Sequence, residues 1–243
     1  MTALPASPAS PPLDRWGIAL GGARGERFSG QNHLLVTVPG FLEHPEAAIE
    51  AATLQNFAKI TPQYPGVRAA LDPAVCRTWL GALGPLLDEA FGRAEGGWAM
   101  QAWFSLVTTP PAALLPIQRL PHVDGTDARQ VAMMLYLHRT GHGGTAFFRH
   151  KATGLEALTP ETWPRYAAAV QAEYGRALPP AAYPTDGAPH FARTHVVAGH
   201  FNEAVFYRGN ILHSGVIDNA APLSASPREG RLTINAFFRP AAG

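Results

Sequence analysis

The sequence predicts a mainly β fold, a double-sheet jelly roll with flanking helices packed on one side. Helical patterns lie early in the chain, whereas short segments rich in β-branched and aromatic residues follow later. The two kinds of element do not alternate, which argues against a parallel, doubly wound sheet. Glycine pairs and Gly-Asn steps, of which Gly143-Gly144 and Gly209-Asn210 are the clearest, mark turns between the strands.

The length of 243 residues fits one domain, and a hydrophobic fraction of 47% is enough to form a core. Residues 1–13 are rich in Pro, Ala and Ser, so we expect a flexible N-terminal tail. We expect residues 14–243 to form a single domain with an N-terminal helical layer and an insertion at 151–192.

Three helices are expected, at residues 44–58, 72–91 and 159–176. The second has the clearest start, because Asp72 suits the N-cap and Pro73 suits the first helical position. Gly84 and Pro85 are candidates to break this helix.

Eight strands are expected from the β-branched and aromatic segments, at residues 33–38, 98–108, 130–137, 145–148, 194–198, 203–208, 212–217 and 231–238. The Gly209-Asn210 step predicts a tight hairpin across residues 205–216. This hairpin would place His213 just after the turn.

Composition excludes several kinds of partner. The formal charge is +1, from 19 basic and 18 acidic residues, and Lys59 and Lys151 are the only lysines, so nothing indicates nucleic-acid binding. The lone Cys76 excludes an internal disulfide, and we expect a buried, inert thiol on a helix. No signal-peptide pattern or membrane-length apolar run is present, so we expect a cytoplasmic protein without a membrane partner.

The most informative residues are His122 and Asp124, followed about 90 positions later by His213. Two imidazoles and one carboxylate are the ligands of the 2-His-1-carboxylate facial triad, which leaves metal positions open. In an extended chain the i, i+2 spacing puts both side chains on one face, and Pro116 and Pro121 favour extended backbone. Taken alone, His213 is also typical of a hydrogen-bonded core histidine.

Arg231 opens an apolar strand and shares a face with Thr233 and Asn235. A buried arginine needs an anion, and a ligand carboxylate could supply it. Arg208 competes with Arg231 for this role. A basic cluster at residues 149–151 could also line a pocket for an acidic substrate, or could be a solvated strand end.

The ordered set His-x-Asp, His and Arg resembles the Fe(II)/2-oxoglutarate-dependent dioxygenases, specifically their prolyl-hydroxylase-like branch, over residues 98–238. The chain is also similar to an uncharacterised bacterial family that combines His-x-Asp with two further motifs. These are Gly-Gly-Thr-x-Phe, at residues 143–147, and Tyr-Arg-Gly-Asn-x-Leu-His-Ser, at residues 207–214.

The resemblance implies a double-stranded β-helix core of the cupin-like jelly-roll type. It implies Fe(II) bound by the catalytic residues His122, Asp124 and His213. It also implies that Arg231 and Tyr136 bind the C5 carboxylate of 2-oxoglutarate. The reaction would consume O2, release succinate and CO2, and hydroxylate an amino acid, a peptidyl residue or a small natural product.

Two other functions stay open at this point. One is a non-catalytic metal-binding or sensor protein on the same fold, and the other is a metal-independent β-sandwich binding protein. Metal analysis and titration with 2-oxoglutarate would separate the three. The sequence predicts a small-molecule or peptide substrate and leaves the oligomeric state open.

Overall fold

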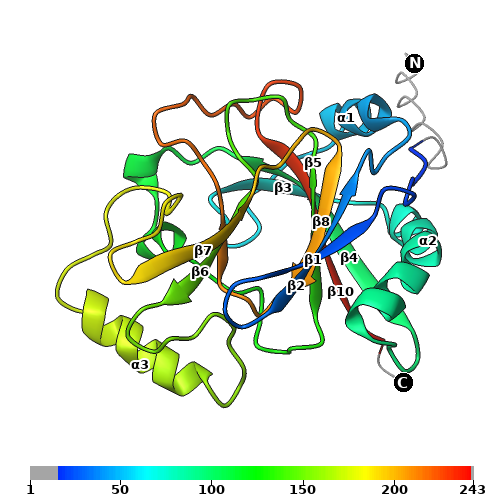
Figure 1. Cartoon of the computed structure of the whole chain (residues 1–243). Helices are drawn as coiled ribbons and strands as arrows, with labels where there is room; N and C mark the ends of the chain where they lie inside the picture. The colour runs from blue at the N-terminus through cyan, green and yellow to red at the C-terminus, as the bar shows by residue number, and fades with distance from the viewer. Residues whose placement is uncertain (1–15, 242–243) are drawn as a thin grey trace, which may run out of the picture.

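The computed structural model describes residues 16–241 as two antiparallel β-sheets with helices on their outer faces (Figure 1). The tail predicted for residues 1–13 lies outside the described residues. The larger sheet has seven strands in the order β1-β2-β8-β5-β10-β4-β3. Its strands are β1 (Arg24–Phe28), β2 (His33–Pro39), β3 (Gly66–Ala70), β4 (Trp98–Val107), β5 (Val131–Tyr136), β8 (Glu203–Arg208) and β10 (Leu232–Pro240).

The smaller sheet has three strands in the order β7-β6-β9. These are β6 (Thr145–His150), β7 (Phe191–Val197) and β9 (His213–Gly215). An isolated antiparallel bridge between His122 and His213 extends this sheet beyond β9. The two residues exchange backbone hydrogen bonds of 2.9 and 2.8 Å, so the segment carrying His122 runs directly beside β9.

A cluster of buried apolar side chains from both sheets packs in the space between them. It comprises Phe28, Leu35, Ala132, Tyr136, Phe147, Val197, Val205, Tyr207 and Ile211. Two antiparallel sheets packed face to face around a shared interior confirm the predicted jelly-roll fold.

Helices α1 (Pro45–Thr53) and α2 (Pro73–Phe91) cover the other face of the larger sheet. Asp72 caps α2, because its Oδ1 accepts a hydrogen bond of 2.7 Å from the Ala74 N–H. Pro85 lies inside α2 without ending it. Leu83 and Leu87 on either side are fully buried in the core, and this packing offsets the hydrogen bond that proline removes.

The third helix, α3 (Trp163–Tyr174), packs against the smaller sheet, where Tyr166 contacts a cluster containing Phe148 and Phe191. Figure 1 shows α3 on the opposite side of the molecule from α1 and α2. The prediction that helices pack on one side therefore holds for α1 and α2 and is wrong for α3. Within residues 16–241, each helix is too short or too polar to traverse a lipid bilayer.

All eight predicted strands are present, but the hairpin predicted across residues 205–216 is wrong. The turn exists, because the Ile211 N–H donates to the Arg208 carbonyl oxygen at 3.1 Å. The strands on its two sides, β8 and β9, nevertheless belong to different sheets. The chain crosses between sheets at this turn, which places His213 in the smaller sheet with its ring centre 5.0 Å from that of Tyr207 on β8.

Two short 3₁₀ helices, η2 (Pro111–Ala113) and η3 (Pro116–Arg119), lead from β4 toward His122. The Gln118 side chain accepts a hydrogen bond of 2.8 Å from the Leu115 N–H and donates one of 2.8 Å to the Pro62 carbonyl oxygen. These bonds tie the approach to His122 to the loop before β3.

Candidate metal centre

Three of the residues singled out from the sequence meet at one end of the space between the sheets. One potential ligand atom from each of His122, Asp124 and His213 lies within 4.8 Å of the others. The Asp124 N–H donates to the Gly209 carbonyl oxygen at 2.8 Å, so residues 122–124 run beside the segment that leads to β9. The segment is paired at His122 and bends at Asp124, and it directs both side chains to the same site.

Hydrogen bonding fixes the orientation of the His213 ring. Its Nδ1 lies 2.8 Å from the Ile211 carbonyl oxygen, which can only accept, so Nδ1 carries the proton. Nε2 is therefore the ring nitrogen available to bind a metal, and it lies 3.6 Å from Asp124 Oδ2. A backbone carbonyl that holds the remote nitrogen is the usual support for a metal-binding imidazole.

The electrostatics of the cluster favour a bound cation. Asp124 Oδ2 is buried and has no hydrogen-bond partner. Burial raises the pKa of this carboxyl group, although the nearby His213 and Arg68 oppose the shift. The His122 side chain is exposed to the cavity but surrounded by protein. Desolvation by this protein environment lowers its pKa to about 3, with smaller contributions from the charges of His213 and Arg68. A neutral imidazole and an unpartnered carboxylate oxygen are the donors that a divalent metal requires, so the site fits one.

Arg231 immediately precedes β10, is buried and lines the same cavity as this cluster. Its Nε and Nη2 donate to the Gly143 carbonyl oxygen at 3.2 and 3.1 Å, and Nη2 also donates to Gly144 at 2.7 Å. Within residues 16–241 it forms no ion pair with a carboxylate, and burial lowers its pKa. The two carbonyl groups orient the guanidinium but leave its charge uncompensated.

Arg208, the competitor for this role, points away from the cavity. Its Nη1 donates to the Arg129 carbonyl oxygen at 2.8 Å, and its Nη2 donates to the Phe91 carbonyl oxygen. The preceding residue on β8, Tyr207, lines the cavity instead. Successive strand residues face opposite sides, which explains why Tyr207 and Arg208 differ.

Tyr136 lies next to Arg231 but not on the cavity wall. Its Oη is 2.8 Å from Thr145 Oγ1, and the Arg231 Cζ lies 6.0 Å from its ring centre. Burial raises the pKa of Tyr136 to about 12, so the hydroxyl stays protonated. Thr145 does line the cavity, and it stands between the tyrosine hydroxyl and the open space.

The cavity that contains the cluster has a volume of about 660 Å³, within the range of small-molecule sites. Of the aromatic residues predicted to wall it (Trp103, Phe104, Phe147, Phe148 and Tyr207), Tyr207 does so. The other aromatic groups on the wall come from loops, α3 and β10: Tyr64, Trp163, Tyr166, Tyr183 and Phe237.

Sequence reasoning missed Arg68, a second arginine in the same cavity. It lies on β3, one of two strands that were not predicted. The β3 sequence Gly-Val-Arg-Ala-Ala has a single β-branched residue, and its strand forms one edge of the larger sheet. No local sequence signal distinguishes Arg68 from a surface arginine.

A short stretch before α3 supports the strand that carries His213. The Leu212 N–H donates to the Glu156 carbonyl oxygen at 2.7 Å, and the Leu158 N–H donates to Asn210 at 2.8 Å. The Asn210 side chain returns a hydrogen bond of 3.0 Å to the Leu158 carbonyl oxygen. The residues immediately before His213 are therefore held by backbone pairing with residues 156–158.

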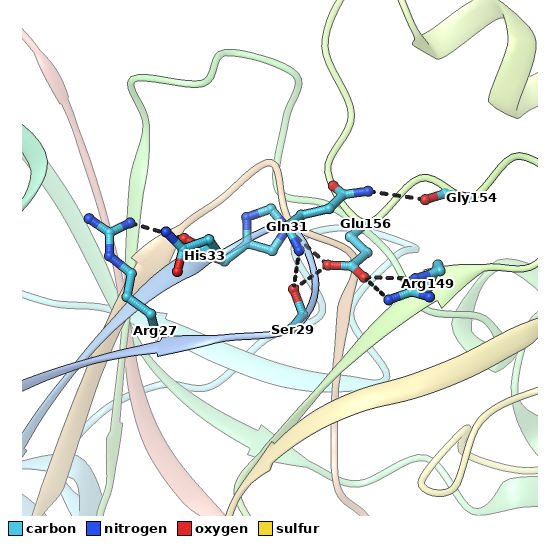
Figure 2. Close-up of polar contacts among 8 residues, drawn as sticks. Arg27, Ser29, Gln31, His33, Arg149, Gly154 and Glu156 are labelled. Carbon is cyan, nitrogen blue, oxygen red and sulfur yellow. Dashed lines mark hydrogen bonds and ion pairs between the residues drawn. The ribbon is translucent and has the colours of Figure 1, made fainter.

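The Glu156 side chain anchors this stretch to the β1–β2 hairpin, as Figure 2 shows. The carboxylate is buried and accepts hydrogen bonds from Arg149, whose Nε and Nη2 lie at 2.8 and 2.7 Å, and from Ser29 Oγ. His33 Nε2 lies 3.2 Å from the same group. Burial lowers the pKa of His33, although Glu156 opposes the shift. Glu156 and the residues that contact it therefore link the β1–β2 hairpin of the larger sheet to β6 of the smaller sheet, close to the stretch that supports His213.

Replacing Arg149 with methionine should lower the free energy of unfolding by about 2 kcal/mol. Removing one partner of a fully buried ion pair costs roughly 3–5 kcal/mol, and the Arg149 side chain is 45% exposed, which reduces the loss. Urea denaturation would measure the change. The matched control is Arg193→Met, which removes a surface pair with Asp186 and should cost less than about 1 kcal/mol. Equal losses in the two variants would contradict the anchoring role of Glu156.

The basic cluster predicted at residues 149–151 does not line the cavity. Arg149 pairs with the buried Glu156 carboxylate. His150 is fully buried and forms a pair with Glu173 on α3, with its Nε2 2.8 Å from the carboxylate. Lys151 donates to the Pro189 carbonyl oxygen at 2.8 Å on the surface. The interpretation as a pocket for an acidic substrate is therefore wrong for these residues, and the buried pair instead fastens α3 to the smaller sheet.

The fold and the cluster together define a jelly-roll protein with a candidate site for a divalent metal ion. The chain belongs to DUF6445, a family of unknown function, whose model matches residues 24–238. A search of curated proteins found no match.

Several solved structures resemble the chain at low sequence identity. The non-heme alpha-ketoglutarate-dependent epimerase SnoN from nogalamycin biosynthesis is 14% identical, with a TM-score of 0.45 over 85% of this chain and 78% of that one. HygX from Streptomyces hygroscopicus, with nickel and 2-oxoglutarate bound, is 14% identical, with a TM-score of 0.46 over 85% and 83%. An N-substituted L-amino acid dioxygenase from Burkholderia ambifaria AMMD is 11% identical, with a TM-score of 0.38 over 86% and 82%.

Proposed function

We propose that the protein is an Fe(II)- and 2-oxoglutarate-dependent dioxygenase of the prolyl-hydroxylase-like type. It would hydroxylate an amino acid, a peptidyl residue or a small natural product, with release of succinate and CO2. The observation that carries the proposal is the presence, in one cavity, of a His-Asp-His cluster and a buried arginine without a carboxylate partner. The order of these residues along the chain supports the same assignment.

His122, Asp124 and His213 would hold the iron, with His213 Nε2 presented by the bond from Nδ1 to the Ile211 carbonyl oxygen. When bound, the iron would supply the activation of O2 that accompanies oxidative decarboxylation of 2-oxoglutarate. Three protein ligands leave positions open for the co-substrate and O2. The part of the protein is to keep the His122 imidazole neutral, to orient the His213 ring, to place the carboxylate and to exclude bulk water.

Arg231 would bind the C5 carboxylate of 2-oxoglutarate. Carbonyl oxygens of Gly143 and Gly144 accept from its Nε and Nη2, which fixes the guanidinium plane while its positive charge is unpaired. A dicarboxylate would supply the missing anion in a site where an uncompensated charge is costly. Tyr136 would support binding of the same carboxylate indirectly, through its hydrogen bond with Thr145, which faces the cavity.

The proposal is tested by succinate formation with the purified protein, Fe(II) and 2-oxoglutarate, with and without pools of amino acids, peptides and small natural products. We expect iron-dependent succinate that falls to background in Asp124→Ala, because removing a ligand abolishes the metal site. The matched control is Asp127→Ala, which removes an exposed carboxylate three positions away and should leave turnover unchanged. Iron binding without binding or turnover of 2-oxoglutarate would overturn the proposal in favour of a metal-binding protein without catalytic activity.

A further inference from the structure

We propose that Arg68 is a second anion receptor in the cavity, and that the prime substrate is a carboxylate with an apolar body. The inference rests on the proposed function, because it names the substrate class of the same site. Arg68 would hold the substrate carboxylate, while α3 would contact the apolar part.

The position of Arg68 gives it access to the cavity and to the metal cluster. Arg68 is on β3, with Ser105 on β4 as its Cα partner, and it lines the cavity together with His122 and Asp124. The charge of Arg68 is close enough to contribute to the pKa shifts of both His122 and Asp124. A ligand held by Arg68 would therefore lie near the proposed metal.

The Arg68 guanidinium lacks a carboxylate partner. Arg68 Nε is buried without a hydrogen-bond partner, and within residues 16–241 the guanidinium forms no ion pair with a carboxylate. The Tyr64 ring lies 4.0 Å from the Arg68 Cζ, and the Tyr64 hydroxyl faces both Arg68 and Ser105, closely enough for both to lower its pKa against the larger effect of burial. Arg68 lines the cavity, so its unpaired guanidinium is the group that a ligand there could satisfy. A guanidinium suits a carboxylate.

The charges that line the cavity also call for a second anion. Within the described residues, Asp124 is the only carboxylate on the wall, and Arg68 and Arg231 are the only guanidinium groups. With a divalent metal the site carries a net charge of about +3, which the two carboxylates of 2-oxoglutarate reduce to about +1. A substrate with one carboxylate would neutralise the remainder, and Arg68 is the cation not assigned to 2-oxoglutarate.

The shape of the cavity indicates the rest of the substrate. A volume of about 660 Å³ leaves room beside a five-carbon co-substrate. Helix α3 contributes an apolar wall of Trp163, Tyr166, Ala167 and Val170. Trp163 and Ile117 also line the cavity and are 45% and 53% exposed, so an apolar body would gain contacts toward the solvent side.

The first arm of the test uses metal-free protein and a pair of probes that differ in charge. The probes are 3-(4-fluorophenyl)propionate and its primary amide, and their dissociation constants are measured by ¹⁹F NMR. The background is Arg231→Met, so that Arg231 cannot bind the acid. We expect the acid to bind about tenfold more tightly than the amide, and this preference to vanish in Arg68→Met/Arg231→Met. Arg68→Lys in the same background should retain part of the preference, which shows that the loss is not caused by misfolding.

Equal binding of acid and amide in the Arg231→Met background, or a preference that survives removal of Arg68, would overturn the proposal. Because this arm includes neither metal nor 2-oxoglutarate, its result is independent of whether the protein turns 2-oxoglutarate over.

The second arm separates the substrate carboxylate from the C1 carboxylate of 2-oxoglutarate. Calorimetric titration of 2-oxoglutarate into the nickel-loaded protein should give a dissociation constant in Arg68→Met within about threefold of the wild-type value. A loss as large as that in Arg231→Met would assign Arg68 to the co-substrate and overturn the proposal.

Discussion

Replacing Arg231 with methionine is expected to weaken the binding of 2-oxoglutarate by about 100-fold or more. Truncating one partner of a buried, hydrogen-bonded charge pair costs roughly 2–5 kcal/mol of binding free energy, because the other charge is left buried and unpaired. Arg231 is 3% exposed, and the carbonyl oxygens of Gly143 and Gly144 hold its guanidinium in place before any ligand arrives. Calorimetric titration of the nickel-loaded protein would measure the loss.

The same substitution should change the free energy of unfolding of the ligand-free protein by no more than about 1 kcal/mol. Methionine removes an unpaired buried cation, which is favourable, and leaves the Gly143 carbonyl without its guanidinium donor, which is unfavourable. The Gly144 carbonyl keeps a hydrogen bond of 3.0 Å from the Val216 N–H.

The matched control for Arg231→Met is Arg208→Met. The Arg208 guanidinium also donates to two backbone carbonyl oxygens, but it lies outside the cavity. Arg208→Met should therefore retain the affinity for 2-oxoglutarate. A similar loss of affinity in both variants would mean that the effect of Arg231→Met reflects disturbed folding and not loss of an anion receptor.

The parts of the site that could be predicted from the sequence are those fixed by local chain geometry. The two-residue repeat of an extended chain determines that His122 and Asp124 share a face. The same alternation, on the strand that follows Arg231, places Asn235 and Phe237 on the cavity wall. These relations need no knowledge of which strands are neighbours.

Relations between distant segments were harder to predict. The pattern around Gly209-Asn210 is typical of a hairpin, yet β8 pairs with β2 and β5, and β9 pairs with β6. A tight turn has the same sequence signature whether the chain folds back beside itself or crosses to the facing sheet. Strand pairing is decided by packing of both sheets around the shared interior, which residues 205–216 do not encode alone.

The two edge strands of the larger sheet show a second limit of predicting strands from the sequence. β1 has the sequence Arg-Gly-Glu-Arg-Phe and is exposed except at Phe28, so it lacks the apolar alternation that predicts a strand. β1 is ordered by pairing with β2 along its whole length. β3 is also an edge strand without apolar alternation, so the strand and Arg68 on it were missed. The proximity of Arg68 to Asp124 depends on the register of β3 against β4.

Replacing Asp124 with asparagine is expected to make the metal-free protein more stable and the metal-loaded protein less stable than the wild type. Asp124 Oδ2 is buried without a hydrogen-bond partner, and burial raises the pKa of the carboxyl group, so its charged form is unfavourable in the absence of metal. A neutral amide of the same shape should raise the free energy of unfolding by about 1 kcal/mol. The change is opposite in sign to that of most substitutions at a buried polar residue.

Metal binding should make the wild type more stable than Asp124→Asn. A ligand present at about 100 times its dissociation constant stabilises the native state by about 2.7 kcal/mol, and Asp124→Asn should lose nearly all of this gain because the amide is a weak, neutral ligand. Thermal unfolding with and without Mn(II) would measure both effects. The control Asp127→Asn changes an exposed carboxylate paired with Arg129 and should gain the same metal stabilisation as the wild type. If Mn(II) stabilised Asp124→Asn as much as the wild type, the carboxylate would not be a ligand, and its buried charge would need another partner.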